Sequence, residues 1–153
     1  MKTNILARIL ILLIITISFF SCKDDDPITP AEDHFEAIGT VIYDATGALA
    51  VSILRGETND TLRITNGERS DHFDVKFYDD NENIVDPPNN EHTKLSYEIG
   101  DSTFASWWQH EGEEGGFEFH LDGKKVGKTT LQLFIVHENH NDYRSGEIPL
   151  VIE

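Results

Sequence analysis

From about residue 34 to its end, the chain alternates apolar and polar residues with a period of two, and this pattern limits the fold more than any other feature. The clearest stretch is HFDVKFYD, residues 72–79, in which Phe73, Val75 and Phe77 are separated by polar residues. Successive side chains of a β-strand point to opposite faces of a sheet, so the stretch predicts a strand with one buried face. No segment shows the 3.6-residue period of a convincing amphipathic helix.

Turn-forming residues divide this region into about eight short apolar segments. A first strand is predicted over residues 35–44, and the segments 49–56 and 60–67 suggest a hairpin. Eight short strands without helices, in one domain of residues 34–153, predict an all-β, antiparallel β-sandwich. Strict alternation on two of the strands predicts six core side chains: Phe73, Val75, Phe77, Leu131, Leu133 and Ile135.

Residues 1–21 have the pattern of a targeting segment, with two basic residues before the apolar run ILILLIITISFF. The only cysteine, Cys22, follows Ser21, and this junction resembles the cleavage site of a bacterial lipoprotein signal peptide. Phe19 and Phe20 depart from the usual leucine and small residue at that site. The resemblance implies cleavage before Cys22 and a lipid, such as palmitate, on its sulfur. An uncleaved signal anchor with an incidental cysteine is the alternative.

Residues 22–33 contain the acidic run KDDD and two prolines, and they have almost nothing to bury. This composition predicts a lipidated cysteine followed by a flexible acidic tether. A lysine and acidic residues directly after the cysteine resemble the export signal of some Gram-negative lipoproteins. The resemblance implies an outer-membrane location, lipid-anchored and facing the cell surface. The simpler interpretation of KDDD is a solvated start to the tether.

Four stretches of the domain resemble one family: FDVKFYDDNEN, LSYEIGDSTFASW, GKKVGKTTLQLFI and the final IPLVI. In this order they are similar to the later strands of a group 2 bacterial immunoglobulin-like domain, over residues 60–153. The resemblance implies an immunoglobulin-like sandwich. Residues 81–83 lack the glycine that the family has there, and residues 49–65 look like an insertion.

The formal net charge is −16, and removal of residues 1–21 would take away two basic residues and make it more negative. Nucleic acids and flat anionic membrane surfaces require a basic face, so neither is an expected partner. No nucleophile elbow, free catalytic cysteine or Ser-His-Asp spacing is recognisable. We therefore expect a protein that is not an enzyme.

The stretch HENHNDY, residues 137–143, follows the apolar run LQLFIV. A neutral imidazole is the commonest side-chain ligand for zinc or copper. In an immunoglobulin-like strand order, His34 would lie at the same end of the sandwich as His137 and His140. This predicts a site for Zn or Cu, with an oxygen ligand from one of three acidic residues: Glu36, Glu138 or Asp142.

Two further pairs are candidates for binding. His72 and His120 occupy outward positions on strands that should pair, so they form a candidate second metal pair. Trp107 and Trp108 are adjacent, so one should face the core and the other is a candidate contact for a partner. Two alternatives stay open: the histidines are ordinary surface residues, or the protein is a metal-free accessory or adhesion module that binds a protein or a glycan.

Overall fold

The computed structural model describes residues 34–89 and 91–153, and within these ranges the chain is all-β with no helix. The predicted signal peptide, Cys22 and the predicted tether lie outside the described residues. No helix fit to cross a membrane occurs in the part that is described. The strands are β1 Gly39–Asp44, β2 Leu49–Leu54, β3 Glu57–Thr58, β4 Leu62–Ile64, β5 Phe73–Tyr78, β6 Ile84–Val85, β7 Thr93–Ile99, β8 Ala105–Trp108, β9 Glu118–Gly123, β10 Gly127–His137 and β11 His140–Ile152.

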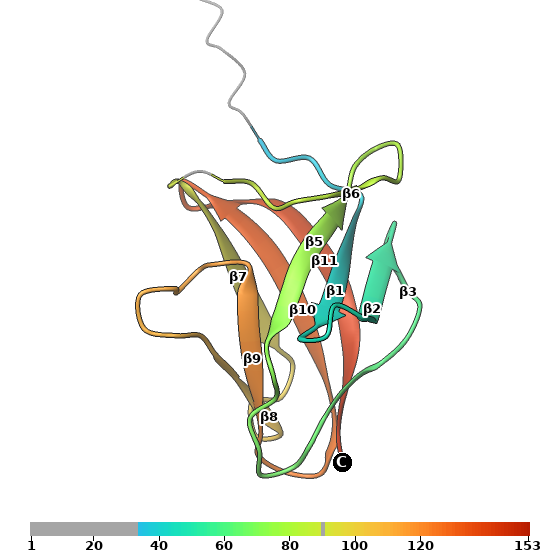
Figure 1. The fold of residues 1–153 in the computed structure, drawn as a ribbon, viewed down its shortest axis with the longest axis vertical. Coiled ribbons are helices and arrows are strands. Elements are labelled where there is room, and N and C mark those ends of the chain that lie inside the picture. Colours follow the sequence, from blue (N-terminus) through green and yellow to red (C-terminus); the bar gives the residue numbers. More distant parts are fainter. Residues whose placement is uncertain (1–33, 90) are drawn as a thin grey trace, which may run out of the picture. The chain divides into compact units, whose positions relative to one another are not determined.

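The strands form two sheets, which confirms the predicted β-sandwich (Figure 1). A seven-stranded sheet has the order β3-β2-β1-β5-β9-β8, with β6 added to β5, and a four-stranded sheet has the order β4-β11-β10-β7. Within the described ranges there are eleven strands rather than about eight, and three of them, β3, β4 and β6, are only two or three residues long. Strand β4 pairs with β11 in parallel, whereas the other pairs are antiparallel.

The predicted hairpin between residues 49–56 and 60–67 is wrong. Strand β2 pairs with β1 and with the short β3, while β4 lies in the other sheet beside β11. Leu62 and Ile64 are buried there. A direct β2–β4 pairing would place Leu62 and Ile64 in the seven-stranded sheet. They lie instead in the four-stranded sheet, where Leu150 and Ile152 are their partners in the register.

The core lies between the two sheets and is built by the predicted alternation. Strand β5 alternates buried and half-buried residues along its whole length. All six residues expected inside are buried, which confirms that part of the prediction. Aromatic rings pack against one another in the core, where Phe77 makes edge-to-face contacts with both Phe117 and Tyr143.

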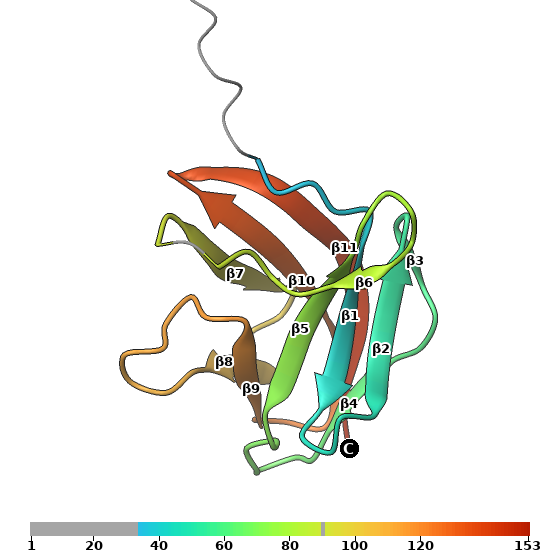
Figure 2. The ribbon, with the colours of Figure 1, turned by 45° about the horizontal axis from the view of Figure 1, so that its top comes forward.

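Two local features place histidines at one end of the sandwich. The first strand begins at Gly39 rather than at residue 35, and the chain before it, from residue 34, passes beside the start of β11 (Figure 2). Strands β10 and β11 form a hairpin in which His137 and His140 are partners. Only Glu138 and Asn139 connect them, with φ values of 46° and 78°. Positive φ at both positions is typical of a type I′ turn.

Candidate metal centre

The three histidines predicted to converge lie together at the end of the β10–β11 hairpin. His34 comes from the segment before β1, His137 ends β10 and His140 begins β11. One ring nitrogen of each histidine and one carboxylate oxygen of Asp142 lie within 4.8 Å of one another. Of the three acidic residues considered from the sequence, Asp142 is the one in the group. Glu36 and Glu138 are exposed and outside it.

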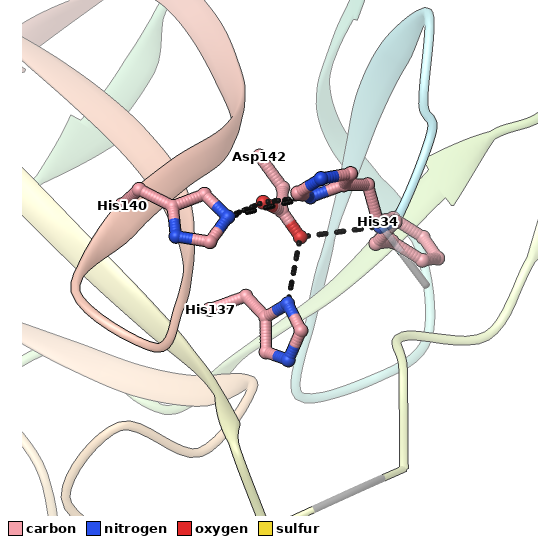
Figure 3. Close-up of polar contacts among 5 residues, drawn as sticks. His34, His137, His140 and Asp142 are labelled. Atoms are coloured by element: carbon pink, nitrogen blue, oxygen red, sulfur yellow. Dashed lines mark hydrogen bonds and ion pairs between the residues drawn. The ribbon is translucent and has the colours of Figure 1, made fainter. Parts of the chain in front are cut away.

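Asp142 is the centre of the cluster, as Figure 3 shows. Its Oδ1 atom lies 2.9 Å from His34 Nδ1 and 3.1 Å from His140 Nε2. The backbone N–H of Phe35 donates to Oδ2 over 3.2 Å. His137 Nδ1 faces the same Oδ2 atom at 3.6 Å. The carboxylate therefore joins the segment before β1 to both strands of the hairpin.

Burial distinguishes the inner and outer parts of the cluster. The Asp142 side chain is 1% exposed and that of His137 is 13% exposed, while the His34 and His140 side chains are each more than 40% exposed. Burial alone would raise the pKa of Asp142. The hydrogen bonds from His34 and from the Phe35 N–H, with the charges of His34 and His140, outweigh it and lower that pKa. Asp142 is thus held as a carboxylate, which is the form that ligates metals.

The spacing of the ligand atoms fits a tetrahedral ion. Zinc bonds of about 2.0–2.1 Å place the ligand atoms about 3.4 Å apart at the edges of a tetrahedron. His34 Nδ1, His140 Nε2 and Asp142 Oδ1 form a triangle with sides of 2.9, 3.1 and 3.3 Å. His137 Nδ1 is buried and has no hydrogen-bond partner. An orphaned imidazole nitrogen beside this triangle is the natural fourth ligand.

Strand geometry explains why the residues meet. His140 and Asp142 are two residues apart on β11, so their side chains leave the same face. His137 is opposite His140 across the tight turn. The sequence showed the spacing of these three residues. It did not distinguish Asp142 from the other acidic residues. Alternation along residues 140–143 could have done so, because it places Asp142 on the same face as His140.

The second predicted pair also lies together, since the rings of His72 and His120 are 6.3 Å apart between centroids. The residues whose ligand atoms gather around His72, however, are Asp74 and Glu118. Sequence reasoning missed these two carboxylates. Each is two residues from one of the histidines, so strand alternation would have placed them on the same face.

Trp107 and Trp108 differ in their surroundings as predicted for adjacent strand residues. Trp107 packs on the core and stacks between Tyr97 and Phe119, with ring centroids 4.3 and 4.1 Å away. On the other face, the Arg69 guanidinium lies 3.8 Å from the centre of the Trp108 ring. Both tryptophans are half-buried. Their role in binding a partner stays a prediction.

Comparison with known proteins identifies no family for this chain. Neither a scan against known protein families nor a search of curated proteins finds a match. Among solved structures, the crystal structure of domains 4 and 5 of the S-layer protein SbsC matches with a TM-score of 0.40 and 13% sequence identity. The match covers 67% of this chain and 50% of the SbsC chain. This chain therefore spans half of the length of the SbsC chain that it matches. The resemblance to group 2 immunoglobulin-like domains stays a prediction.

Proposed function

We propose that this protein is a non-enzymatic binding module for a divalent transition metal ion, held by His34, His137, His140 and Asp142. Three imidazole nitrogens and one carboxylate oxygen suit tetrahedral zinc, and copper(II) accepts the same donors in a distorted geometry. The observation that carries the proposal is the buried, partnerless Nδ1 of His137, which faces a carboxylate already bonded to two other histidines.

The electrostatics of the chain support a cation as the ligand. The formal net charge is −16, so the field of the whole protein attracts positive ions. At the cluster itself the bound ion would be close to the negative charge of Asp142, whose side chain is 1% exposed. Limited contact with water strengthens this attraction relative to that at an exposed carboxylate. A site of this kind should resist added salt better than diffuse attraction does.

The proposal places the module at the outer membrane, anchored by a lipid on Cys22 and facing outward. Its support is the sequence of residues 1–33 alone, namely the apolar run, the cysteine and the acidic tether. The metal-free alternative is an accessory or adhesion module that binds a protein or glycan through an edge strand or an exposed tryptophan. Trp107 is stacked between two rings and Trp108 lies under Arg69, so the tryptophans lend that alternative little support, while binding through an edge strand stays open.

Zinc calorimetry tests the metal site on the full-length chain, purified in a mild detergent because residues 9–20 are apolar. At pH 7.5 and raised salt, the variant His137→Ala/His140→Ala should lose one tight equivalent of zinc that the unchanged chain binds. Binding to the unchanged chain should weaken below about pH 6, since a free imidazole titrates near pH 6.5 and its protonated form cannot ligate.

His92→Ala is the matched control, because the His92 ring lies 6.5 Å from that of His137 but is not part of the ligand group. This variant should bind zinc as the unchanged chain does. Equal, weak and salt-sensitive binding in all three proteins would show that HENHNDY is only a polar turn.

A further inference from the structure

Two mirrored sequences meet where β5 begins and pairs with β9, HFD at residues 72–74 and EFH at residues 118–120. Phe73 pairs with Phe119, and Asp74 pairs with Glu118. The two phenylalanines are buried in the core. Alternation then sends the polar residues that flank them to the opposite face of the sheet.

Two like charges meet directly across this strand pair. The Val75 N–H donates to the Phe117 carbonyl over 2.9 Å, so Asp74 and Glu118 occupy the adjacent non-hydrogen-bonded position. Opposite side chains approach most closely at such positions, and like charges there are destabilising. Lys76 is next along the outward face of β5, but its ammonium is bonded to Asp86 at 2.7 Å.

His72 lies between these two carboxylates without a good hydrogen bond to either. Its Nε2 is 3.6 Å from Asp74 Oδ2, and its Nδ1 is 3.8 Å from Glu118 Oε1. One ligand atom from each of the three residues lies within 4.8 Å of the others. Both distances from His72 are too long for direct hydrogen bonds. They involve different ring nitrogens, of which a single ion would use only one, and the 4.8 Å grouping is the one that counts one ligand atom per residue.

An independent observation concerns His120 on the neighbouring strand. Its Nδ1 lies 3.0 Å from the Ser70 carbonyl oxygen. Because a carbonyl only accepts, Nδ1 must carry the hydrogen and a neutral ring then has its lone pair on Nε2. That Nε2 is buried and has no hydrogen-bond partner. Histidines that ligate metals commonly donate their other ring N–H to a backbone carbonyl in this way.

We propose that His72, Asp74, Glu118 and His120 form a second divalent transition-metal site, on the outward face of the β5–β9 pair. Two imidazoles and two carboxylates suit zinc, cobalt(II) or copper(II). An ion shared by two imidazoles holds their ring centres roughly 5 Å apart, given bonds of about 2.0–2.1 Å. The observed 6.3 Å therefore needs an approach of about 1 Å, which rotation of the half-exposed His72 side chain provides.

Copper(II) quenching of tryptophan fluorescence tests the second site, because the Trp108 ring centre is 5.0 Å from that of His120. The measurement uses the full-length chain carrying His137→Ala/His140→Ala, which removes the first centre. Quenching should saturate with one equivalent of copper at raised salt. Both His72→Ala and the size-matched Asp74→Asn/Glu118→Gln should weaken this binding at least tenfold.

His110→Ala is the control, because the exposed His110 ring is only 5.3 Å from that of His120 but His110 is not in the proposed ligand set. It should leave the copper affinity unchanged. Wild-type affinity in His72→Ala, or loss in His110→Ala alone, would overturn the second site. Neither outcome bears on the first centre, which the zinc comparison tests separately.

Discussion

At the scale of single residues, Asp142 is unusual because it is held as a carboxylate although its side chain is almost completely buried. A carboxylate with 1% exposure is costly to bury unless charged or N–H partners surround it. His34 Nδ1 and His140 Nε2 both approach its Oδ1 and are 3.3 Å from each other. Without a metal, the tautomers decide which nitrogen donates: both can donate to this oxygen, or one can donate to the other. A cation between them replaces this crowded arrangement with direct bonds to both nitrogens.

Tyr143, the neighbour of Asp142 on β11, gives a pH-dependent prediction. Burial raises the pKa of its phenol to about 12, against the opposing effect of its 2.7 Å hydrogen bond with Thr40. An unfolded tyrosine titrates near pH 10, so the neutral phenol contributes its full stability below about pH 10. That contribution, about 2–3 kcal/mol, is lost as the pH rises through about 12.

Urea unfolding of the unchanged chain and of Tyr143→Phe, at pH 8 and at several values between 10 and 11.5, checks this. At pH 8 the variant should be less stable by about 1–3 kcal/mol, because the buried Thr40 hydroxyl loses its partner. The difference should shrink as the pH rises, since only the unchanged chain pays for ionising this phenol. A difference that stays constant with pH would contradict the raised pKa.

At the scale of elements, the β10–β11 turn controls how well the first centre is formed. Glu138 and Asn139 both have positive φ, and this conformation is unfavourable for Glu138. Asn-Gly is the preferred pair for a type I′ turn. We expect Glu138→Asn/Asn139→Gly to raise the free energy of unfolding by about 1 kcal/mol. Zinc should also bind more tightly, because the turn holds His137 and His140 as partners.

Chemical denaturation and zinc calorimetry on the same protein measure both effects. Glu138→Val is the opposite variant, since a β-branched residue tolerates positive φ poorly. It should lower both the stability and the zinc affinity. If the two variants differ in neither property, the turn does not organise the site.

The sequence predicted individual strands well where buried and exposed residues alternate. It predicted less well which strands pair when they are far apart in the sequence. Strand β5 follows the alternation completely, and its buried residues are those expected. Strand β11 begins at His140, inside the polar stretch HENHNDY, where composition alone gives no sign of a strand. Polar residues can continue a strand when one face is solvated, and here the hairpin register fixes them. The parallel pairing of β4 with β11 left no local signal.

At the scale of the whole molecule, the first centre depends on contacts between distant parts of the chain. His34 and Asp142 are 108 residues apart in sequence. Their meeting follows from the packing of the two sheets on each other, which puts the segment before β1 beside the start of β11. An assumed sandwich topology was enough to predict that the three histidines meet. The choice of Asp142 and the pairing of Asp74 with Glu118 needed the actual strand registers.

An ion bound at the first centre should therefore stabilise the whole domain. Metal that binds only the folded state adds about 2.7 kcal/mol when its free concentration is 100 times the dissociation constant. For a domain of this size, that corresponds to a rise of roughly 10 °C in the unfolding temperature. Thermal unfolding of the His72→Ala background, with and without zinc at raised salt, isolates the first centre. His34→Ala in this background should lose the rise, because the ion then no longer connects the segment before β1 to the hairpin.

His92→Ala in the same background should keep the full rise, because its ring is near His137 but outside the ligand group. The rise should also be much smaller at pH 5.5 than at pH 7.5, since protonated imidazoles do not bind zinc. If His34→Ala retains the rise, the ion is held by the hairpin alone. The 108-residue connection through His34 would then not be part of the metal site.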